Sequence, residues 1–439
     1  MDMTHPLTPE ACRRAAHERL QRRDPETAEQ FFRHLLELLP HDVEALSFLA
    51  SRHYARGELV PARDLSLHAV AREPERVDLL QLLGAVQLAN GDFGDAAGTL
   101  QRSLQLAPQA FVARLQLGVA QEQLGRAHDA LVTWYTAIRT AQNQGRWTND
   151  QTTAPAVREL VKYAINYVNR ERRRLFSEVL EPLRDRYGAS ELPRVEQSLS
   201  IYLGEQPANI PDARQQPKFL YFAGVPSQPY YERSRFPWLE ALEQATGDIR
   251  GELEEQLGAA RDLEPFLGTS AGPATGEMLK SWGKDEAAWD AYFFYRHGKR
   301  YDDHCAACPI TAGILDRLPL VRIRDHAPET LFSVLRPGTH ILPHRGVTNT
   351  RLVTHLPLIV PDHCAINVGG QEHVWQPGKC VTFDDTFLHE AWNRSGETRV
   401  VLILDSWNPD LSEAERAAVT DLVEAISDFN DATAPPAQA

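Results

Sequence analysis

The stretch SVLRPGTHILPHRGVTNTRLVTHLPLIVPDHC, residues 333–364, decides the fold of the second half of this chain. Its segments HILPH (340–344) and RLVTHLPLIV (351–360) are rich in Val, Ile, Leu and Thr, and Gly, Pro, Asn and Asp lie between them. Branched apolar residues favour β-strands, whereas the residues between the segments favour turns. The stretch therefore predicts short strands that follow one another closely.

The same pattern continues on both sides of this stretch. It recurs in LFSVL (331–335), CAINV (364–368), CVTFDD (380–385) and RVVLILDSW (399–407). Six short strands separated by turn residues are typical of an all-β sandwich or barrel. Before this region, at 236–265 and 274–292, the apolar spacing predicts two helical stretches.

Histidines are concentrated in the predicted β region. Six of the sixteen lie there: His340, His344, His355, His363, His373 and His389. Strands that are distant in sequence can bring two imidazoles to one iron, zinc or copper ion. A non-haem iron site often adds a carboxylate two residues after the first histidine, but that position here is Gly346. Asp384 or Asp385 would then have to replace it, and structural roles for the histidines stay open.

Three segments in order carry a resemblance to a known family: 333–364, WQPGKCVTFDDTFLHEAWN (375–393) and RVVLILDSWNP (399–409). With FPWL (236–239) and CPIT (308–311), they resemble the aspartyl/asparaginyl β-hydroxylases over about residues 216–412. The resemblance implies a double-stranded β-helix (jelly roll) and an iron(II)- and 2-oxoglutarate-dependent dioxygenase. It also accounts for Gly346, because this family holds iron with two histidines and water.

The resemblance assigns roles to individual residues. His344 and His389 would be the catalytic iron ligands, and Arg399 would pair with the distal carboxylate of 2-oxoglutarate, since a guanidinium binds carboxylates bidentately. Ser333 and His355 would complete the cosubstrate site. The expected cofactors are therefore Fe(II), 2-oxoglutarate and O2.

The same resemblance predicts the substrate. Arg351 would bind an acidic or amide side chain, so that the β-carbon of an aspartyl or asparaginyl residue in a peptide or protein is hydroxylated. Val353 departs from the pattern, because some relatives carry a second arginine there. Alternatives are the same chemistry on a free or carrier-bound amino acid or on a lipid, and a non-catalytic repeat scaffold.

The first third of the chain repeats with a period of 34 residues. Pro40, Pro74 and Pro108 keep this step, as do Gly57, Gly91 and Gly125, and as do Leu49, Leu83 and Leu117. Small residues allow two helices to approach, and glycine permits the left-handed turn between them. The pattern resembles tetratricopeptide repeats, with units near 43–76, 77–110 and 111–144 and a degenerate unit near 9–42 that has Arg23 at the turn position.

The fold class predicted for the whole chain is a multidomain α + β protein, an α-solenoid followed by a jelly-roll catalytic domain. The repeats would form either a groove that holds the peptide or protein substrate or a purely structural element. The predicted parts are the repeat domain at 1–145, a linker and helical segment at 146–215, the β-helix domain at 216–412, and a C-terminal helix and tail at 413–439.

Composition excludes some partners. The chain has 46 basic and 60 acidic side chains, so its formal net charge is −14, which argues against general nucleic-acid or anionic-membrane binding. The basic run at 170–174 is interpreted as a solvated helix face. No apolar run is long enough to span a bilayer, and five cysteines and no apolar leader predict a cytoplasmic protein.

Overall fold

The computed structural model describes residues 8–259, 263–267, 278–282 and 286–434. The chain forms two compact units: a helical unit of residues 1–174 and 428–439, and a sheet unit of residues 175–427. Helices α9 (Arg158–Tyr187) and α16 (Glu413–Ala432) contribute residues to both. The predicted helix after 413 is therefore present, and the last five residues of the predicted tail lie outside the described residues.

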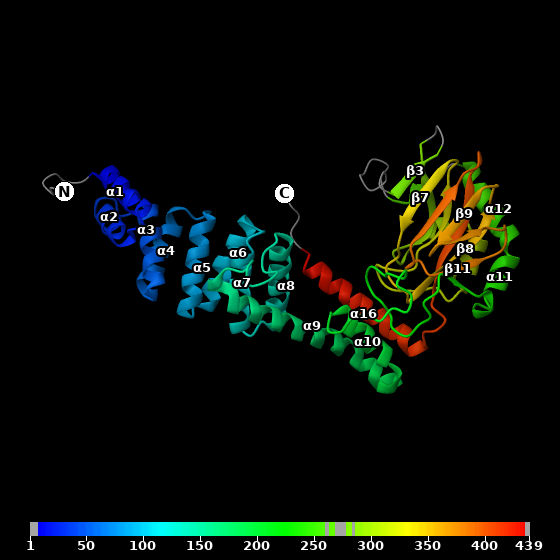
Figure 1. Cartoon of the computed structure of the whole chain (residues 1–439), viewed down its shortest axis with the longest axis horizontal. Coiled ribbons are helices and arrows are strands. Elements are labelled where there is room, and N and C mark those ends of the chain that lie inside the picture. Colours follow the sequence, from blue (N-terminus) through cyan, green and yellow to red (C-terminus); the bar gives the residue numbers. More distant parts are fainter. Residues whose placement is uncertain (1–7, 260–262, 268–277, 283–285, 435–439) are drawn as a thin grey trace. The chain divides into compact units, whose positions relative to one another are not determined.

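The helical unit is built from antiparallel helix pairs, drawn from blue to green in Figure 1. Its helices are α1 (Pro9–Gln21), α2 (Pro25–Leu38), α3 (Val43–Ala55), α4 (Leu59–Arg72), α5 (Val77–Asn90), α6 (Phe93–Leu106), α7 (Phe111–Gln123) and α8 (Ala127–Asn143). The first helices of the four pairs begin at residues 9, 43, 77 and 111, where the 34-residue period places the repeats. The predicted solenoid of tetratricopeptide repeats is confirmed.

The turn within each pair requires a left-handed backbone. Gly57, Gly91 and Gly125 have φ angles of +77°, +83° and +73°. Arg23 takes the same conformation, with φ +57°, at the matching position of the first pair. A non-glycine residue is strained there. The leading repeat is therefore degenerate in sequence but keeps the geometry of the others.

Two further glycines of the repeat allow close packing between the helices of a pair. A Cβ atom on Gly84 would lie 2.7 Å from the Leu100 side chain, and one on Gly118 would overlap the indole of Trp134. That indole is fully buried and donates from Nε1 to the carbonyl oxygen of Leu115 at 2.9 Å. Small residues at these positions are thus a packing requirement.

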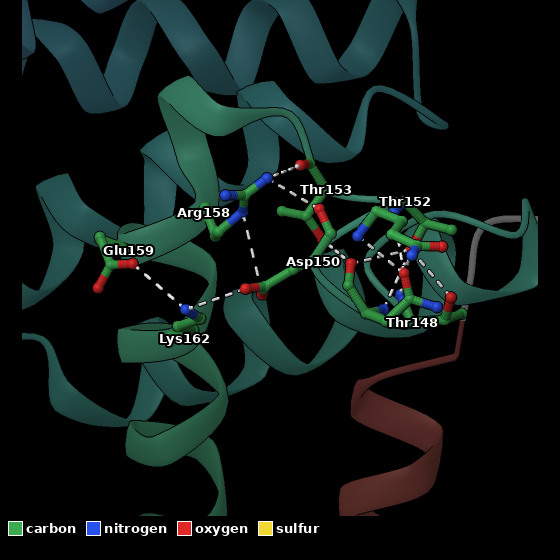
Figure 2. Close-up of polar contacts among 9 residues, drawn as sticks. Thr148, Asp150, Thr152, Thr153, Arg158, Glu159 and Lys162 are labelled. Carbon is green, nitrogen blue, oxygen red and sulfur yellow. Dashed lines mark hydrogen bonds and ion pairs between the residues drawn. The ribbon is translucent and has the colours of Figure 1, made fainter.

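The polar segment after α8, predicted as a linker, is an ordered loop with many internal hydrogen bonds (Figure 2). The side chain of Asn149 accepts hydrogen bonds from the backbone N–H groups of Gln151 and Thr152. Arg158 donates to the carbonyl oxygens of Asp150 and Thr153 at 2.9 and 3.3 Å. Hydrogen bonds within the loop thereby satisfy polar groups that, after the end of α8, no longer have partners within a helix.

The sheet unit contains two antiparallel sheets. The larger has the order β1-β11-β8-β13-β6-β4-β2, with β5 on β4, and the smaller β10-β9-β12-β7-β3. The strands are β1 (Tyr230–Tyr231), β2 (Glu264–Pro265), β3 (Leu279–Ser281), β4 (Trp289–Arg296), β5 (Lys299–Arg300), β6 (Thr330–Leu335), β7 (Thr339–His344), β8 (Arg351–Ile359), β9 (Cys364–Val368), β10 (Gln371–Val374), β11 (Val381–Phe383), β12 (His389–Asn393) and β13 (Arg399–Trp407). Two facing antiparallel sheets with crossing connections confirm the jelly-roll class.

The two faces of the larger sheet have different partners. Alternation along β13 sends Val401 into the core between the sheets and Leu402 into a second core on the opposite face. That second core is completed by residues from helices α12 (Thr246–Ala259), α14 (Asp302–Ala307) and α15 (Pro309–Leu315). Burial on both faces explains why the β13 sequence is almost continuously apolar.

The helix predicted at 274–292 is wrong for its described part. Residues 279–281 form β3 and residues 289–296 form β4, while 274–277 and 283–285 lie outside the described residues. In β4, Ala291 and Phe293 pack in one buried cluster, and Tyr292 and Phe294 pack in another. The run of aromatic residues is therefore apolar because the strand is buried on both faces.

The sheet unit also contains α10 (Pro193–Tyr202), α11 (Leu239–Gln244) and the part of α16 that precedes residue 428. Arg194 of α10 forms a bidentate ion pair with the buried Glu415 of α16. Of the helices that the structure describes, none combines the length and apolar composition of a membrane span.

Candidate active site

The two histidines predicted as metal ligands lie side by side. His344 ends β7 and His389 begins β12, and these residues are direct partners in the antiparallel ladder. Their ring centroids are 4.1 Å apart. The sheet register therefore brings together two imidazoles that are distant in sequence.

Backbone hydrogen bonds fix the tautomers of both rings. His344 Nδ1 lies 2.9 Å from the carbonyl oxygen of Leu342, and His389 Nδ1 lies 3.0 Å from that of Phe387. A carbonyl oxygen can only accept, so each Nδ1 carries the proton and each Nε2 keeps a lone pair. Burial, the first cause in both cases, lowers the pKa of each histidine to about 4. Both rings are therefore neutral near pH 7 and are suited to bind a metal ion.

Arg399, the predicted cosubstrate residue, is a buried cation that forms no ion pair with a carboxylate of the described residues. Its Nη1 donates to the carbonyl and hydroxyl oxygens of Ser333 at 3.1 and 3.2 Å. Its Nε has no hydrogen-bond partner among the described residues, and the guanidinium lies 4.8 Å from the ring centroid of Trp375. Burial lowers its pKa to about 10. Such a site favours an anionic ligand, since an isolated buried charge is costly.

Ser333 and His355 lie beside Arg399 as predicted. The Ser333 hydroxyl oxygen accepts from Trp289 Nε1 at 2.9 Å as well as from Arg399, so its own proton is free for a ligand. His355 is fully buried, and its Nδ1 has no partner in the part of the chain that the structure describes. Burial, then the charge of Arg399, lowers its pKa well below the usual value, so His355 is neutral.

One cavity of about 230 Å³ connects these groups. Its lining includes all six residues predicted from the sequence, namely Ser333, His344, Arg351, His355, His389 and Arg399. Much of the remaining wall is apolar, with Val353, Ile366 and Phe383 among the lining side chains. The cavity thus has an imidazole pair and a cationic group within an apolar enclosure.

Arg351, the predicted substrate residue, is already paired with carboxylates. It donates to Asp405 at 2.6 Å and to Asp385 at 3.4 Å. Burial lowers the pKa of Arg351, but Asp405 and Asp385 outweigh burial and raise it overall. A contact between Arg351 and a substrate would require a remaining N–H group or the opening of one of these pairs.

The structure explains Gly346. A Cβ atom at this position would overlap the carboxyl group of Asp385, and the Gly346 N–H donates to the Asp385 carbonyl oxygen at 2.6 Å. Asp385 therefore fills the space that a side chain two residues after His344 would need. Its Oδ1 has no partner among the described residues, and none of their His, Cys, Asp and Glu side chains form a metal-binding group of three or more.

Sequence reasoning missed three acidic or aromatic contributors. Asp405 holds Arg351, Trp289 orients the Ser333 hydroxyl, and Glu329 lines the same cavity. Burial, then the nearby Asp405, raises the pKa of Glu329 to about 7. Of these three residues, only Asp405 lies in a strand that the sequence predicts; Trp289 falls in the stretch predicted as a helix, and Glu329 directly precedes β6.

Comparison with known proteins places the chain in a family. The family described as aspartyl/asparaginyl beta-hydroxylase matches residues 243–409. Aspartate beta-hydroxylase domain-containing protein 2 of Mus musculus is 31% identical over 247 residues, which cover 55% of this chain and 68% of that protein. The chain belongs to the aspartyl/asparaginyl β-hydroxylase family.

Two other relatives of this hydroxylase family differ in their named substrates. An ornithine lipid ester-linked acyl 2-hydroxylase of Rhizobium tropici is 35% identical over 198 residues, 44% of this chain and 66% of that protein. Aspartyl/asparaginyl beta-hydroxylase of Homo sapiens is 31% identical over 137 residues, 31% of this chain and only 18% of that protein. The chain thus spans just under two thirds of the first and a small part of the second.

Solved structures also match part of the chain. A thermophilic TPR protein of Thermus thermophilus is 19% identical with a TM-score of 0.29 and covers 40% of this chain and 91% of that one. A MamA crystal structure is 19% identical with a TM-score of 0.30, and it covers 33% of this chain and 79% of that one.

Proposed function

We propose that this chain is an iron(II)- and 2-oxoglutarate-dependent dioxygenase that hydroxylates the β-carbon of aspartyl or asparaginyl residues in a peptide or protein. The observation that carries the proposal is the buried guanidinium of Arg399, which no described carboxylate pairs with, in a cavity that is also lined by two imidazoles whose Nδ1 atoms donate to backbone carbonyl oxygens. An anionic cosubstrate would compensate the buried charge, and the imidazoles suit a divalent transition metal.

The residues of the cavity fit this pair of cofactors. His344 and His389 would hold iron through Nε2, and their Nδ1 hydrogen bonds keep the rings oriented. Arg399 and Ser333 would bind one carboxylate of 2-oxoglutarate, and His355 would help to hold the other. When bound, iron and 2-oxoglutarate would supply the activation of dioxygen.

The chain itself contributes positioning and exclusion of water. The apolar wall, which includes Val353, Ile366 and Phe383, limits solvent around the imidazole pair. Arg351 would keep Asp385 beside His344, where the unpaired Oδ1 can accept a hydrogen bond from a ligand or water. Preorganised groups of this kind need little rearrangement when the substrate binds.

A second candidate keeps the chemistry and changes the substrate to a lipid or to a free or carrier-bound amino acid. Two observations favour it: the Rhizobium relative is named a lipid hydroxylase, and Val353 makes the cavity wall apolar where a cation would suit an acidic side chain.

We propose a cytoplasmic location for the protein, since its five cysteines are all free. The repeats would hold the peptide or protein substrate.

The first test is succinate formation from 2-oxoglutarate with iron(II), with and without candidate peptides. We expect wild-type protein to form succinate and folded His344→Ala to form essentially none. His373→Ala is the matched control, because His373 lies in β10 and does not line the cavity. If the His344→Ala variant formed succinate at the wild-type rate, His344 would not be an essential iron ligand.

A second measurement separates an enzyme from a scaffold. Calorimetry should detect 2-oxoglutarate binding to wild-type protein with Mn(II), and Arg399→Met should abolish it. Absence of 2-oxoglutarate binding by the folded wild-type protein would favour a non-catalytic repeat scaffold.

For an active enzyme, mass spectrometry of host proteins with and without the gene would reveal substrates as Asp or Asn residues that gain one oxygen atom.

A further inference from the structure

A second hollow adjoins the active-site cavity from outside. It has a volume of about 490 Å³ and is lined by the segment around Arg214, the end of β7, the turn at 369–370 and the start of β12. His389 lines both this outer hollow and the inner cavity. A molecule in the outer hollow therefore lies next to one of the two imidazoles of the candidate metal site.

Arg345 gives the outer hollow a guanidinium that has no ion-pair partner among the described residues. It directly follows His344 and lines the hollow, and its Nε atom is buried. Neither a hydrogen bond to that atom nor an ion pair with this arginine occurs among the residues that the structure describes. An unpaired guanidinium beside a cavity favours an anion that can accept two parallel hydrogen bonds.

The other charged side chains that line the hollow already have partners: Arg214 is ion-paired, and Glu390 is hydrogen-bonded to a histidine. Arg214 forms a bidentate pair with Asp212 and donates to the carbonyl oxygen of Gly369 at 2.7 Å. Glu390 lies 2.7 Å from His340 Nε2. Arg345 is therefore the cation with free donors at this position, and the carboxylate that lines the hollow already has a partner.

We propose that Arg345 binds an acidic side chain of the substrate peptide, next to the residue that is hydroxylated. The inference rests on the proposed function and adds a sequence preference to it: Asp or Glu beside the target Asp or Asn. The hollow suits a peptide, because the side-chain amide of Asn367 and the amide oxygen of Gln216 lie among its lining groups and can pair with peptide backbone, whereas Gln216 Nε2 already donates to the carbonyl oxygen of Ala213 at 3.1 Å.

The test uses a synthetic peptide library with a central Asp or Asn and randomised neighbours, incubated with the full chain, iron(II) and 2-oxoglutarate. Mass spectrometry reads the neighbours of every residue that gains oxygen. We expect wild-type protein to enrich acidic neighbours at least tenfold over neutral ones, since a charge-assisted hydrogen bond changes binding by about tenfold or more. Arg345→Gln should lose this enrichment, and Arg345→Lys should restore part of it.

Each variant's peptide hydroxylation is divided by its own succinate formation without peptide, so a folding defect does not mimic lost selectivity. Arg317→Gln, an exposed substitution after α15 of the sheet unit that lines neither the hollow nor the inner cavity, is the control and should keep the wild-type enrichment. Equal enrichment in wild type and Arg345→Gln, or none in wild type, would overturn the inference while leaving the proposed function intact.

Two further outcomes are decisive. Protein that forms no succinate and binds no 2-oxoglutarate would refute the proposed function itself. Protein that hydroxylates no library peptide, yet forms succinate faster when phosphatidylglycerol vesicles are added, would overturn the inference in favour of a lipid phosphate.

Discussion

Replacing Arg399 with methionine should stabilise the ligand-free protein while it destroys the cosubstrate site. Burial lowers the pKa of Arg399 from 12.5 to about 10. Each pKa unit corresponds to about 1.36 kcal/mol, so holding this charge costs the ligand-free fold about 3 kcal/mol at neutral pH. An apolar side chain removes that cost, as replacement of other buried charges has done.

Lost contacts reduce the expected gain. The variant forfeits the hydrogen bonds to Ser333 and the cation–π contact with Trp375, which together contribute about 1–2 kcal/mol. The free energy of unfolding of the sheet unit should therefore rise by about 1–2 kcal/mol without ligands. With 2-oxoglutarate at a hundred times its Kd, wild type should gain about 2.7 kcal/mol and the variant nothing. The order of stability would then reverse.

Urea unfolding followed by tryptophan fluorescence measures both effects, with Mn(II) in place of iron to prevent turnover. Arg336→Met is the matched control, because Arg336 follows β6, is 59% exposed and pairs with Asp290. Arg336→Met should change the free energy of unfolding by less than about 1 kcal/mol and leave the stabilisation of the protein by 2-oxoglutarate intact. An Arg399→Met variant that is less stable than wild type without ligand, and still stabilised by 2-oxoglutarate, would refute the reasoning.

Three further predictions concern the acid in the cavity and the two close-packed glycines. Burial raises the pKa of Glu329 from 4.5 to about 7, so this carboxyl should lower the free energy of unfolding by about 2–3 kcal/mol as pH rises through this window. Burial also raises the pKa of Asp384 to about 7, so part of the fall does not depend on Glu329. In Glu329→Gln, which keeps an acceptor for the backbone N–H of His297, the fall in urea titrations at several pH values should be smaller by about 2–3 kcal/mol; an unchanged fall would contradict this reasoning. Gly118→Ala should destabilise the helical unit by about 1–3 kcal/mol, because the new methyl group overlaps Trp134. Its control, Gly98→Ala on the exposed side of α6, should stabilise the unit by up to about 1 kcal/mol. Equal shifts of Tm in the two variants would contradict this packing. Gly346→Ala should weaken Mn(II) affinity, measured by calorimetry, at least tenfold, because the new methyl group displaces Asp385. The double variant Gly346→Ala with Asp385→Ala should recover part of this affinity. No recovery would mean that the overlap with Asp385 is not the cause.

Much of the fold follows from local sequence. Helix pairs begin wherever the 34-residue period places them, because each repeat forms its own turn and packs against its neighbour. The six predicted strands correspond to β6, β7, β8, β9, β11 and β13. Strand β12, which carries His389, was not predicted, because the sequence HEAWN lacks a run of branched apolar residues.

The helix predicted at 274–292 shows where local reasoning fails. The sequence WDAYFFYR is apolar on both sides of a strand, and periodicity alone does not separate such a strand from a buried helix. The pairing of β4 with β6 over Trp289 to Tyr295 supplies the missing information. That pairing joins segments about forty residues apart, so no local window contains it.

The sequence by itself determined the repeat period and the β region and, through the family resemblance, predicted the six residues that the structure brings to one cavity. Only the tertiary structure decided that Arg399 is a cation without a carboxylate, that Arg351 is already held by Asp405 and Asp385, and that Asp385 fills the space beside Gly346. The physical reason is that charge compensation and close contact depend on the register of strands distant in sequence. A single-residue shift in register would turn these side chains to the opposite face of the sheet.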